Sequence, residues 1–301
     1  MNYLYYKGWV RFYLLFLLLA FSAVQTRAQM FRQNDLKLIS RQFAFTEGPA
    51  VNSAGDVYFT DQPNNKIWKY GTDGQLSLYM ENAGRSNGLY FDRKGNLLAC
   101  ADEKNELWSI DRNKNIKVLL KAVDRKKLNG PNDLWPDLKG GIYFTDPYYQ
   151  RDYWTRQKAE IEGMKVYYLA PGKQQVVRVA AEDVIKPNGI VGTPDGKYLY
   201  VADIGGNKTY RYTIGKNGSL SNRKMIINQG SDGITLDSEG NLYLTGKGVF
   251  IYNPRGELIG HIEVNEPWTA NVCFGGKKRT DLFITASTAI YTIPMKVAGV
   301  E

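Results

Sequence analysis

The sequence predicts an all-β fold, a six-bladed β-propeller. A motif made of a polar residue, usually a glycine, and a short apolar strand occurs six times along the chain. Most copies continue through a turn rich in Asp and Gly into a second strand of Tyr, Phe, Val and Leu. No stretch beyond the first 28 residues sustains the 3.6-residue apolar period of a helix. Short strands in a repeated unit are typical of propeller blades.

The polar residue that begins each copy is called its head residue below. The head residues are Glu47, Asn87, Asn132, Asn188, Asp232 and Asn271. They lie about 40–56 residues apart, which is room for four short strands per copy. Third strands are expected at 65–70, 105–110, 165–169, 208–212 and 248–252. The segment 36–39 precedes the first copy and is expected to pair with 289–293, which would complete the last blade and close the ring.

The first residues have the pattern of a secretory signal. Lys7 and Arg11 precede the apolar run Phe12–Val24, and the small residue Ala28 follows. The run is shorter than the ~20 residues that span a membrane as a helix. We therefore expect a signal peptide over 1–28, a propeller over 29–301, and an exported protein, periplasmic or secreted, without stable membrane insertion. An uncleaved N-terminal anchor is the alternative.

Composition excludes several kinds of site. The chain has 301 residues, a formal charge of +9, one His and two Cys. One imidazole rules out sites built on two or three His, and two thiols cannot make a four-cysteine metal site. No long basic block is present, so nucleic-acid binding is not expected. Cys100 and Cys273 lie in apolar, strand-like runs and are expected to be buried thiols, with a disulfide as the alternative.

Equivalent positions on the inner strands of a propeller encircle its central channel, so the head residues should form a ring. Carboxylate and carboxamide oxygens are the ligands that hard divalent cations prefer. The residues expected to bind one such cation are Glu47, Asn132, Asn188 and Asp232. Ca²⁺ is the first expectation, with Mg²⁺, Mn²⁺ or Zn²⁺ as alternatives. A turn residue that caps its strand is the competing interpretation, strongest for Asn87 and Asn271.

Several strings, taken in order, resemble the gluconolactonase family, which includes senescence marker protein (regucalcin) and the luciferin-regenerating enzyme. The strings are Glu47-Gly-Pro, Asn64-Asn-Lys-Ile-Trp68, Asn129-Gly-Pro-Asn-Asp133, Tyr143-Phe-Thr-Asp-Pro147, Pro187-Asn-Gly189 and Ser231-Asp-Gly233. The resemblance covers about residues 35–295. It implies a six-bladed propeller with one divalent metal in the channel.

The resemblance also implies roles for particular residues. Glu47, Asn188 and Asp232 match the metal ligands of the family, and Asp232 also matches its proposed acid/base. Asn132 matches a residue that contacts substrate or metal. Gly130 stands near the position where animal members place a substrate-contacting Arg, so their sugar specificity does not carry over to this chain.

These groups suit the hydrolysis of a lactone, a sugar lactone such as gluconolactone first, to the hydroxy acid. In this hypothesis the metal polarises the lactone carbonyl, and Asp232, or a water that it positions, supplies the base. Asn132 and Asn87 are expected to contact the substrate. Two alternatives stay open. One is another ester or phosphotriester hydrolase of the same fold, and the other is a non-catalytic calcium-binding propeller that binds carbohydrate or protein.

The longest interval between head residues contains Pro147–Trp154, a segment rich in aromatic residues. It is expected to overhang the mouth of the channel and to supply Tyr148 for substrate binding. A surface loop packed on its own rings is the alternative. Trp268 is also expected to face the channel. His261 lies outside any head position and is expected on a strand surface rather than in catalysis.

Overall fold

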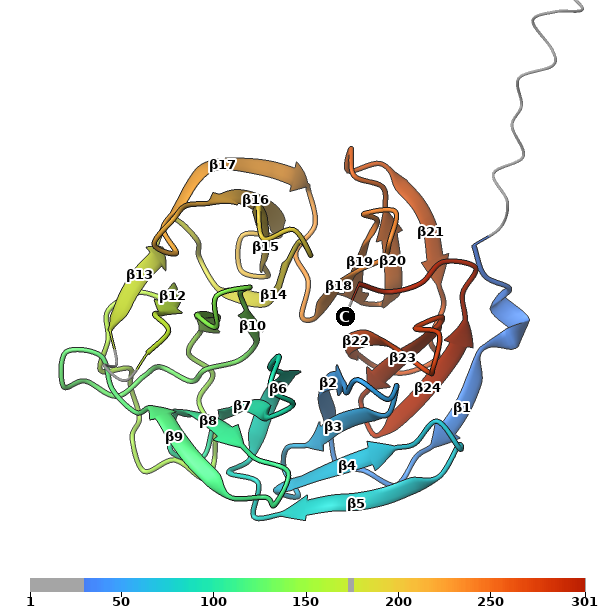
Figure 1. The fold of residues 1–301 in the computed structure, drawn as a ribbon, viewed down its shortest axis with the longest axis horizontal. Coiled ribbons are helices and arrows are strands. Elements are labelled where there is room, and N and C mark those ends of the chain that lie inside the picture. Colours follow the sequence, from blue (N-terminus) through green and yellow to red (C-terminus); the bar gives the residue numbers. More distant parts are fainter. Residues whose placement is uncertain (1–29, 173–175, 301) are drawn as a thin grey trace, which may run out of the picture. The chain divides into compact units, whose positions relative to one another are not determined.

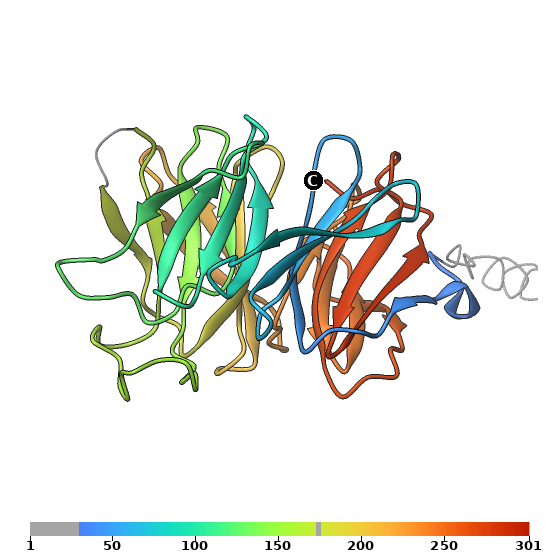
Figure 2. The same cartoon turned by 90° about the horizontal axis from the view of Figure 1, so that it is seen from below.

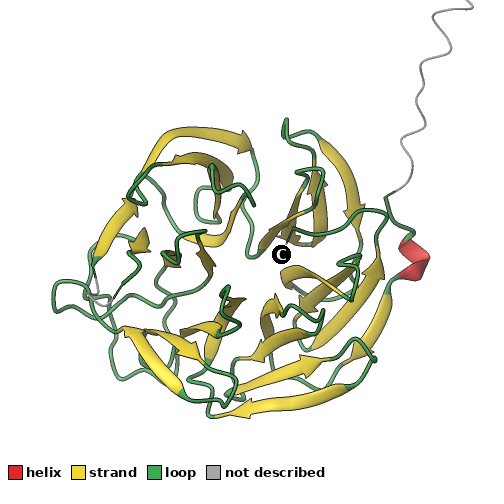
Figure 3. Ribbon diagram, in the orientation of Figure 1, coloured by secondary structure: helices red, strands yellow, loops and turns green. Residues whose placement is uncertain are grey.

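The chain folds as a ring of antiparallel sheets arranged around a central axis (Figure 1). The computed structural model describes residues 30–172 and 176–300. Within these ranges there are six sheets, each of four strands. Figure 3 shows strand in every blade and one short 3-10 helix, η1 (Gln33–Asp35), at the rim. The predicted six-bladed propeller is confirmed. The predicted signal peptide over 1–28 lies outside the described residues and stays a prediction.

Each blade runs from an inner strand at the axis to an outer strand at the rim. Blade 1 comprises β2 (Thr46–Val51), β3 (Val57–Asp61), β4 (Lys66–Tyr70) and β5 (Leu76–Glu81). Blade 2 comprises β6 (Ser86–Phe91), β7 (Leu97–Ala101), β8 (Glu106–Ile110) and β9 (Ile116–Leu120). Blade 3 comprises β10 (Leu134–Pro136), β11 (Ile142–Asp146), β12 (Lys165–Leu169) and β13 (Val177–Ala181). Blade 4 comprises β14 (Pro187–Gly192), β15 (Tyr198–Asp203), β16 (Lys208–Ile214) and β17 (Leu220–Ile227).

Blade 5 comprises β18 (Ile234–Leu236), β19 (Leu242–Gly246), β20 (Gly248–Tyr252) and β21 (Leu258–Ile262). Blade 6 comprises β22 (Thr269–Gly275), β23 (Asp281–Ala286), β24 (Ala289–Pro294) and, from the start of the described chain, β1 (Lys37–Ser40). β1 pairs antiparallel with β24, with Leu38 opposite Tyr291. The predicted closure of the ring is therefore confirmed, and it covers an edge of β24 that would otherwise be free to pair with another chain.

Aromatic packing reinforces this closure between blades 6 and 1. Phe59 of β3 is fully buried and lies with its ring 5.2 Å from that of Phe43 and 5.5 Å from that of Phe283 on β23. The contact with Phe43 is edge-to-face, the favoured geometry of aromatic pairs. The first and last blades thus share one hydrophobic cluster.

The last residues of several second strands, a threonine and an aspartate, have structural roles. Thr60 donates to the carbonyl of Asn87 at 3.1 Å, and Thr145 donates to that of Asn188 at 2.8 Å, so each threonine holds the head residue of the next blade. The aspartate that ends the second strand of blades 1, 3 and 4 accepts backbone N–H groups of the linker that enters its own blade. Those aspartates are Asp61, Asp146 and Asp203.

The two ends of the ring differ. The head residues lie at or just before the start of the inner strands, and the Asp-Gly turns lie at the other end. At that turn end, residues 295–300 lie against β18 and β22, where Val300 donates to the carbonyl of Leu236 at 3.3 Å. Figure 2 shows the C-terminus on one side and the loop after β11 extending from the other.

Both cysteines are buried, and neither forms a disulfide. They lie on strands of different blades, β7 and β22, so the expectation of two buried thiols is confirmed. In the described part of the chain, no helix has the length and apolar character needed to cross a membrane.

We predict that Phe59→Ala lowers the free energy of unfolding by about 3–5 kcal/mol, since it leaves a cavity where the ring closes. Leu78→Ala is the control, because Leu78 is 41% exposed on the outer strand β5 and should cost less than about 1 kcal/mol. Urea denaturation followed by tryptophan fluorescence measures both. Equal losses in the two variants would contradict the importance of this cluster.

Candidate active site

The head residues come together at one end of the inner strands. Glu47, Asn87 and Asn188 are the second residues of β2, β6 and β14. Asn132 and Asp232 lie two residues before the first residues of β10 and β18. All six head residues are buried except Asp232, which is partly exposed. The predicted ring is therefore present, and its most accessible member is the predicted acid/base.

The glycine after most head residues is explained by close approach of the next blade. A Cβ atom at Gly48 would lie 2.1 Å from the carbonyl oxygen of Asn87, and one at Gly189 would lie 2.6 Å from that of Asp232. Only glycine allows the inner strands to approach this closely. The head-glycine motif thus brings neighbouring head residues together, a role that the turn interpretation does not require.

Glu47 is the most strongly perturbed acid of the ring. Its carboxylate accepts the N–H of Gly48 at 2.8 Å and the side-chain amide of Asn271 at 3.4 Å. Burial raises the pKa of Glu47 well above its usual value, and the nearby charges of Asp232 and Asp133 raise it further. In this setting the ionised form is costly unless a cation or donor compensates it.

Asp133 is a third acid in the same cluster. It occupies the position that is Gly in the other conserved copies, so its side chain points where those copies have none. Burial raises the pKa of Asp133 to about 7, although hydrogen bonds from Leu134 and Asn271 oppose the rise. Asp133 was not among the predicted site residues, and its departure from the repeat is the sequence signal that could have identified it.

Asp232 is held by two neighbours. The indole N–H of Trp268 donates to Asp232 Oδ2 at 2.6 Å, which places Trp268 at the ring. Burial raises the pKa of Asp232 to about 6, while hydrogen bonds from Trp268 and Asn188 and the charge of Arg151 oppose the rise. A carboxylate with this pKa is ionised at neutral pH and remains a competent proton acceptor.

The ring has the donor chemistry of a divalent-cation site. Among the described residues, no three Asp, Glu, His or Cys side chains form a metal cluster by themselves, so amide oxygens would have to complete the coordination. Asn87 Oδ1 is buried and has no hydrogen-bond donor within the described residues. The predicted ligands meet this requirement with two carboxylates and two carboxamides: Glu47, Asp232, Asn132 and Asn188. The side chains of the ring therefore fit a divalent cation.

The aromatic segment extends over residues 147–164, between β11 and β12, and is called the insert below. It reaches the ring through Tyr149, whose hydroxyl accepts a hydrogen bond from Asn188 Nδ2 at 3.1 Å. Burial raises the pKa of Tyr149 to about 12, so this hydroxyl stays protonated. The predicted residue Tyr148 instead hydrogen-bonds Gln150 and packs on Trp154, with ring centroids 5.8 Å apart. A substrate contact by Tyr148 stays a prediction.

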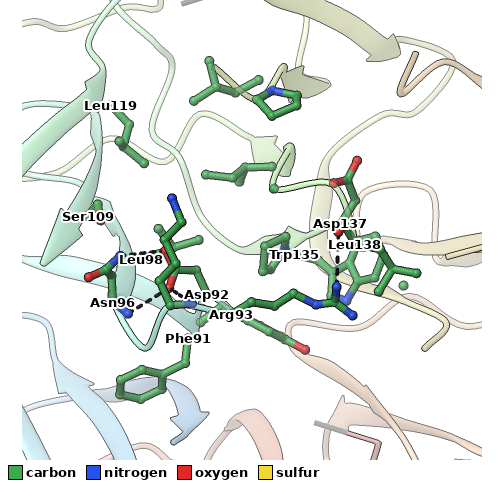
Figure 4. A pocket seen from close by; sticks show the side chains of 18 of the residues that line it. Phe91, Asp92, Arg93, Asn96, Leu98, Ser109, Leu119, Trp135, Asp137 and Leu138 are labelled. Atoms are coloured by element: carbon green, nitrogen blue, oxygen red, sulfur yellow. Dashed lines mark hydrogen bonds between the residues drawn. The ribbon is translucent and has the colours of Figure 1, made fainter. Parts of the chain in front are cut away.

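His261 lies on β21, away from the ring. Its ring stacks on Phe250 at 4.2 Å, and its Nε2 bonds the carbonyl of Lys247 at 2.8 Å. A cavity of about 610 Å³ is also remote from the head residues, because it lies among the turns of blades 2–4. Figure 4 shows its polar wall, where Arg93 reaches the carbonyl of Leu138 at 3.4 Å. Neither feature includes a residue of the ring.

The fold and the ring define a six-bladed propeller with a buried site of oxygen donors at the head end. A family model described as the SMP-30/gluconolactonase/LRE-like region matches residues 45–288. The chain belongs to this family, and the resemblance seen in the sequence is confirmed.

Individual relatives agree with this assignment. A gluconolactonase from Zymomonas mobilis is 27% identical, in a match that covers 88% of this chain and 82% of that protein. A gluconolactonase structure from Xanthomonas campestris has a TM-score of 0.80 at 25% identity, over 86% of this chain and 89% of that one. A calcium-binding protein, regucalcin, from Agrobacterium tumefaciens shares the fold, with a TM-score of 0.73 at 18% identity over 87% of this chain and 94% of that one.

We predict that Glu47→Gln stabilises the metal-free protein at pH 8 and removes its response to Ca²⁺. An acid whose pKa is raised on folding contributes stability at low pH and loses it as the pH rises through the folded-state pKa. The melting temperature of the metal-free wild type should therefore fall between pH 5 and pH 8 more than that of the variant. At pH 8 the variant should melt about 2–4 °C higher, the shift that ~1 kcal/mol produces.

Added Ca²⁺ should raise the melting temperature of the wild type and leave Glu47→Gln unchanged. Glu81→Gln is the matched control, since Glu81 is an exposed partner of Lys66 and lies outside the ring. Scanning calorimetry at the two pH values measures all three proteins. If the variant melts below the wild type at pH 8 without metal, the charge of Glu47 does not destabilise the metal-free fold.

Proposed function

We propose that this protein is a lactone hydrolase that depends on a divalent cation and uses Asp232 as its proton acceptor. The observation that carries the proposal is the position of Asp232. It is the partly exposed acid of the ring, it has a pKa of about 6, and it lies beside Asn188 and within the field of Glu47. Membership of a family that includes proteins named gluconolactonase supports the choice of lactones.

The chain's own residues supply acid–base chemistry and orientation. Trp268 donates to Asp232 Oδ2 and orients the carboxylate, which accepts a proton from the water that attacks the lactone carbonyl. The same proton can then pass to the ring oxygen as the acyl–oxygen bond breaks, which yields the hydroxy acid. Tyr149 orients the carboxamide of Asn188 through its hydroxyl. We assign substrate contact to Asn87 and Asn132, which are head residues at the same end of the inner strands.

Glu47, Asn188 and Asp232 would hold the cation, and the acids and amides around them suit Ca²⁺ before softer ions. A divalent cation bound there supplies positive charge that polarises the lactone carbonyl and stabilises the negative charge that develops on its oxygen. The regucalcin relative that is described as calcium-binding supports Ca²⁺ as the first ion to test.

We predict that Asp232→Asn lowers kcat for glucono-1,5-lactone by about 10²–10⁴-fold, the usual contribution of a general base. The amide keeps the shape and can still accept the Trp268 hydrogen bond, so the fold should persist. His261→Ala, which removes the one His of the chain at a position outside the ring, should change kcat less than about twofold.

Hydrolysis is followed in a pH-stat on a panel that also contains an aliphatic lactone and an aryl ester. Each rate is measured after EDTA treatment and again after Ca²⁺, Mg²⁺, Mn²⁺ or Zn²⁺ is added back. Wild-type activity that survives EDTA, or full activity in Asp232→Asn, would contradict the proposed mechanism. Activity on the aryl ester alone would contradict the assignment of lactones.

A further inference from the structure

Blade 2 uses a repeated aspartate in a different way from its neighbours. In blades 1, 3 and 4 the aspartate at the end of the second strand holds the linker that enters the same blade. The equivalent linker amide in blade 2 belongs to Arg85, and it donates instead to Asn65 Oδ1 at 2.7 Å. The carboxylate of Asp102 is therefore not needed for that linker.

Asp102 instead anchors the insert. Its Oδ2 accepts from Arg151 Nε at 2.8 Å and from the hydroxyl of Tyr153 at 2.7 Å, and its backbone carbonyl accepts the indole N–H of Trp154 at 2.9 Å. The side chain of Asp102 is only 2% exposed. A buried ion pair of this kind sets the position of the groups that it joins. The insert, which leaves from blade 3, is thus attached to blade 2.

This anchoring also explains Gly130. A Cβ atom at Gly130 would lie 3.0 Å from the indole of Trp154 and 3.1 Å from Asp102 Oδ1. The packed insert therefore leaves little room for a side chain at this position. Asp102 also holds the guanidinium of Arg151, which belongs to the insert.

Two cations meet around the tyrosine that touches the ring. Lys186 Nζ lies 3.8 Å from the ring centroid of Tyr149, and the guanidinium carbon of Arg151 lies 5.6 Å from it. The charge of Arg151 lowers the pKa of Asp232, and the charge of Glu47 raises the pKa of Arg151. Arg151 therefore lies against the tyrosine that contacts Asn188, within electrostatic range of the ring acids.

The charges of this pair are only partly balanced. Arg151 is paired with Asp102, whereas the ion pairs found among the described residues include none for Lys186. Lys186 is half-buried, and Arg151 repels it. Two cations held together beside a site are costly unless an anion joins them.

We propose that Arg151 and Lys186 bind an anionic group of the substrate, so that the enzyme prefers lactones that carry a second acidic group over neutral lactones. A carboxylate, sulfonate or phosphate would fit, because the guanidinium and the ammonium both donate to such oxygens. The anion would lie beside Tyr149 while the lactone carbonyl lies at Asp232. This inference rests on the proposed function, because it specifies the substrate class of the same site.

Two lactones that differ in one group test the proposal. Glucono-1,4-lactone carries a hydroxymethyl group at the position where glucaro-1,4-lactone carries a carboxylate. We expect the wild type to hydrolyse the acidic lactone with a kcat/KM at least about tenfold higher. Lys186→Gln should remove that preference through KM and change kcat/KM for the neutral lactone less than about threefold. Lys139→Gln, at the turn end where Lys139 donates to the carbonyl of Lys216, is the matched charge control and should keep the preference.

Arg151→Gln is a second variant with the same expected loss of preference. Calorimetric titration of each protein with gluconate and glucarate gives a readout that does not require turnover. Glucarate binding that depends on Lys186, without hydrolysis of either lactone, would sustain the anion site and overturn the proposed function. Equal kcat/KM for the two lactones in the wild type, or an equal loss on both in Lys186→Gln, would overturn the anion site.

Discussion

The repulsion among three carboxylates at the head end is the constraint on which this structure depends. The charge of Asp232 raises the pKa values of Glu47 and Asp133, and the charge of Asp133 raises that of Glu47 further, in a place where burial already disfavours charge. Such a cluster persists only because the surrounding backbone holds it. Closure of the ring by β1 and β24, and the threonine bonds to successive head residues, supply that rigidity. The folding stability of the blades thus offsets the free-energy cost of holding these acids together in a site suited to a cation.

Much of this centre is visible in the sequence because a propeller repeats its geometry. Six copies with a polar residue at the same place predict a ring, and Glu47, Asn188 and Asp232 lie in it. The closing strand is also predictable, since 36–39 and 289–293 both lie outside complete four-stranded copies. Asp133 could have been identified from the one copy in which Asp replaces Gly. It stayed without a role because a single departure from a pattern does not show which way the side chain points.

The insert is the part that sequence could not resolve. It has no repeat and no strand period, so nothing local distinguishes Tyr148 from Tyr149. Tyr149 rather than Tyr148 contacts Asn188 in the insert that the ion pair of Arg151 with Asp102 attaches to blade 2. This ion pair joins residues far apart in the chain. The repeat even conceals this contact, because Asp102 looks like the linker-holding aspartates of the other blades. A repeated fold thus keeps its centre constant while an irregular loop, attached by one reassigned residue, changes what can bind there.

If the acidic ring and a divalent cation form one unit, cation binding must release protons from the ring. Metal-free protein is titrated with Ca²⁺ at pH 6.5 in two buffers of different ionisation enthalpy. We expect one ion per chain and a net release of protons, because acids with raised pKa values must ionise to bind the ion. The Glu47→Gln/Asp232→Asn double variant should show neither. Binding that releases no protons, or that persists unchanged in the double variant, would show that the cation does not bind at the acids of the ring.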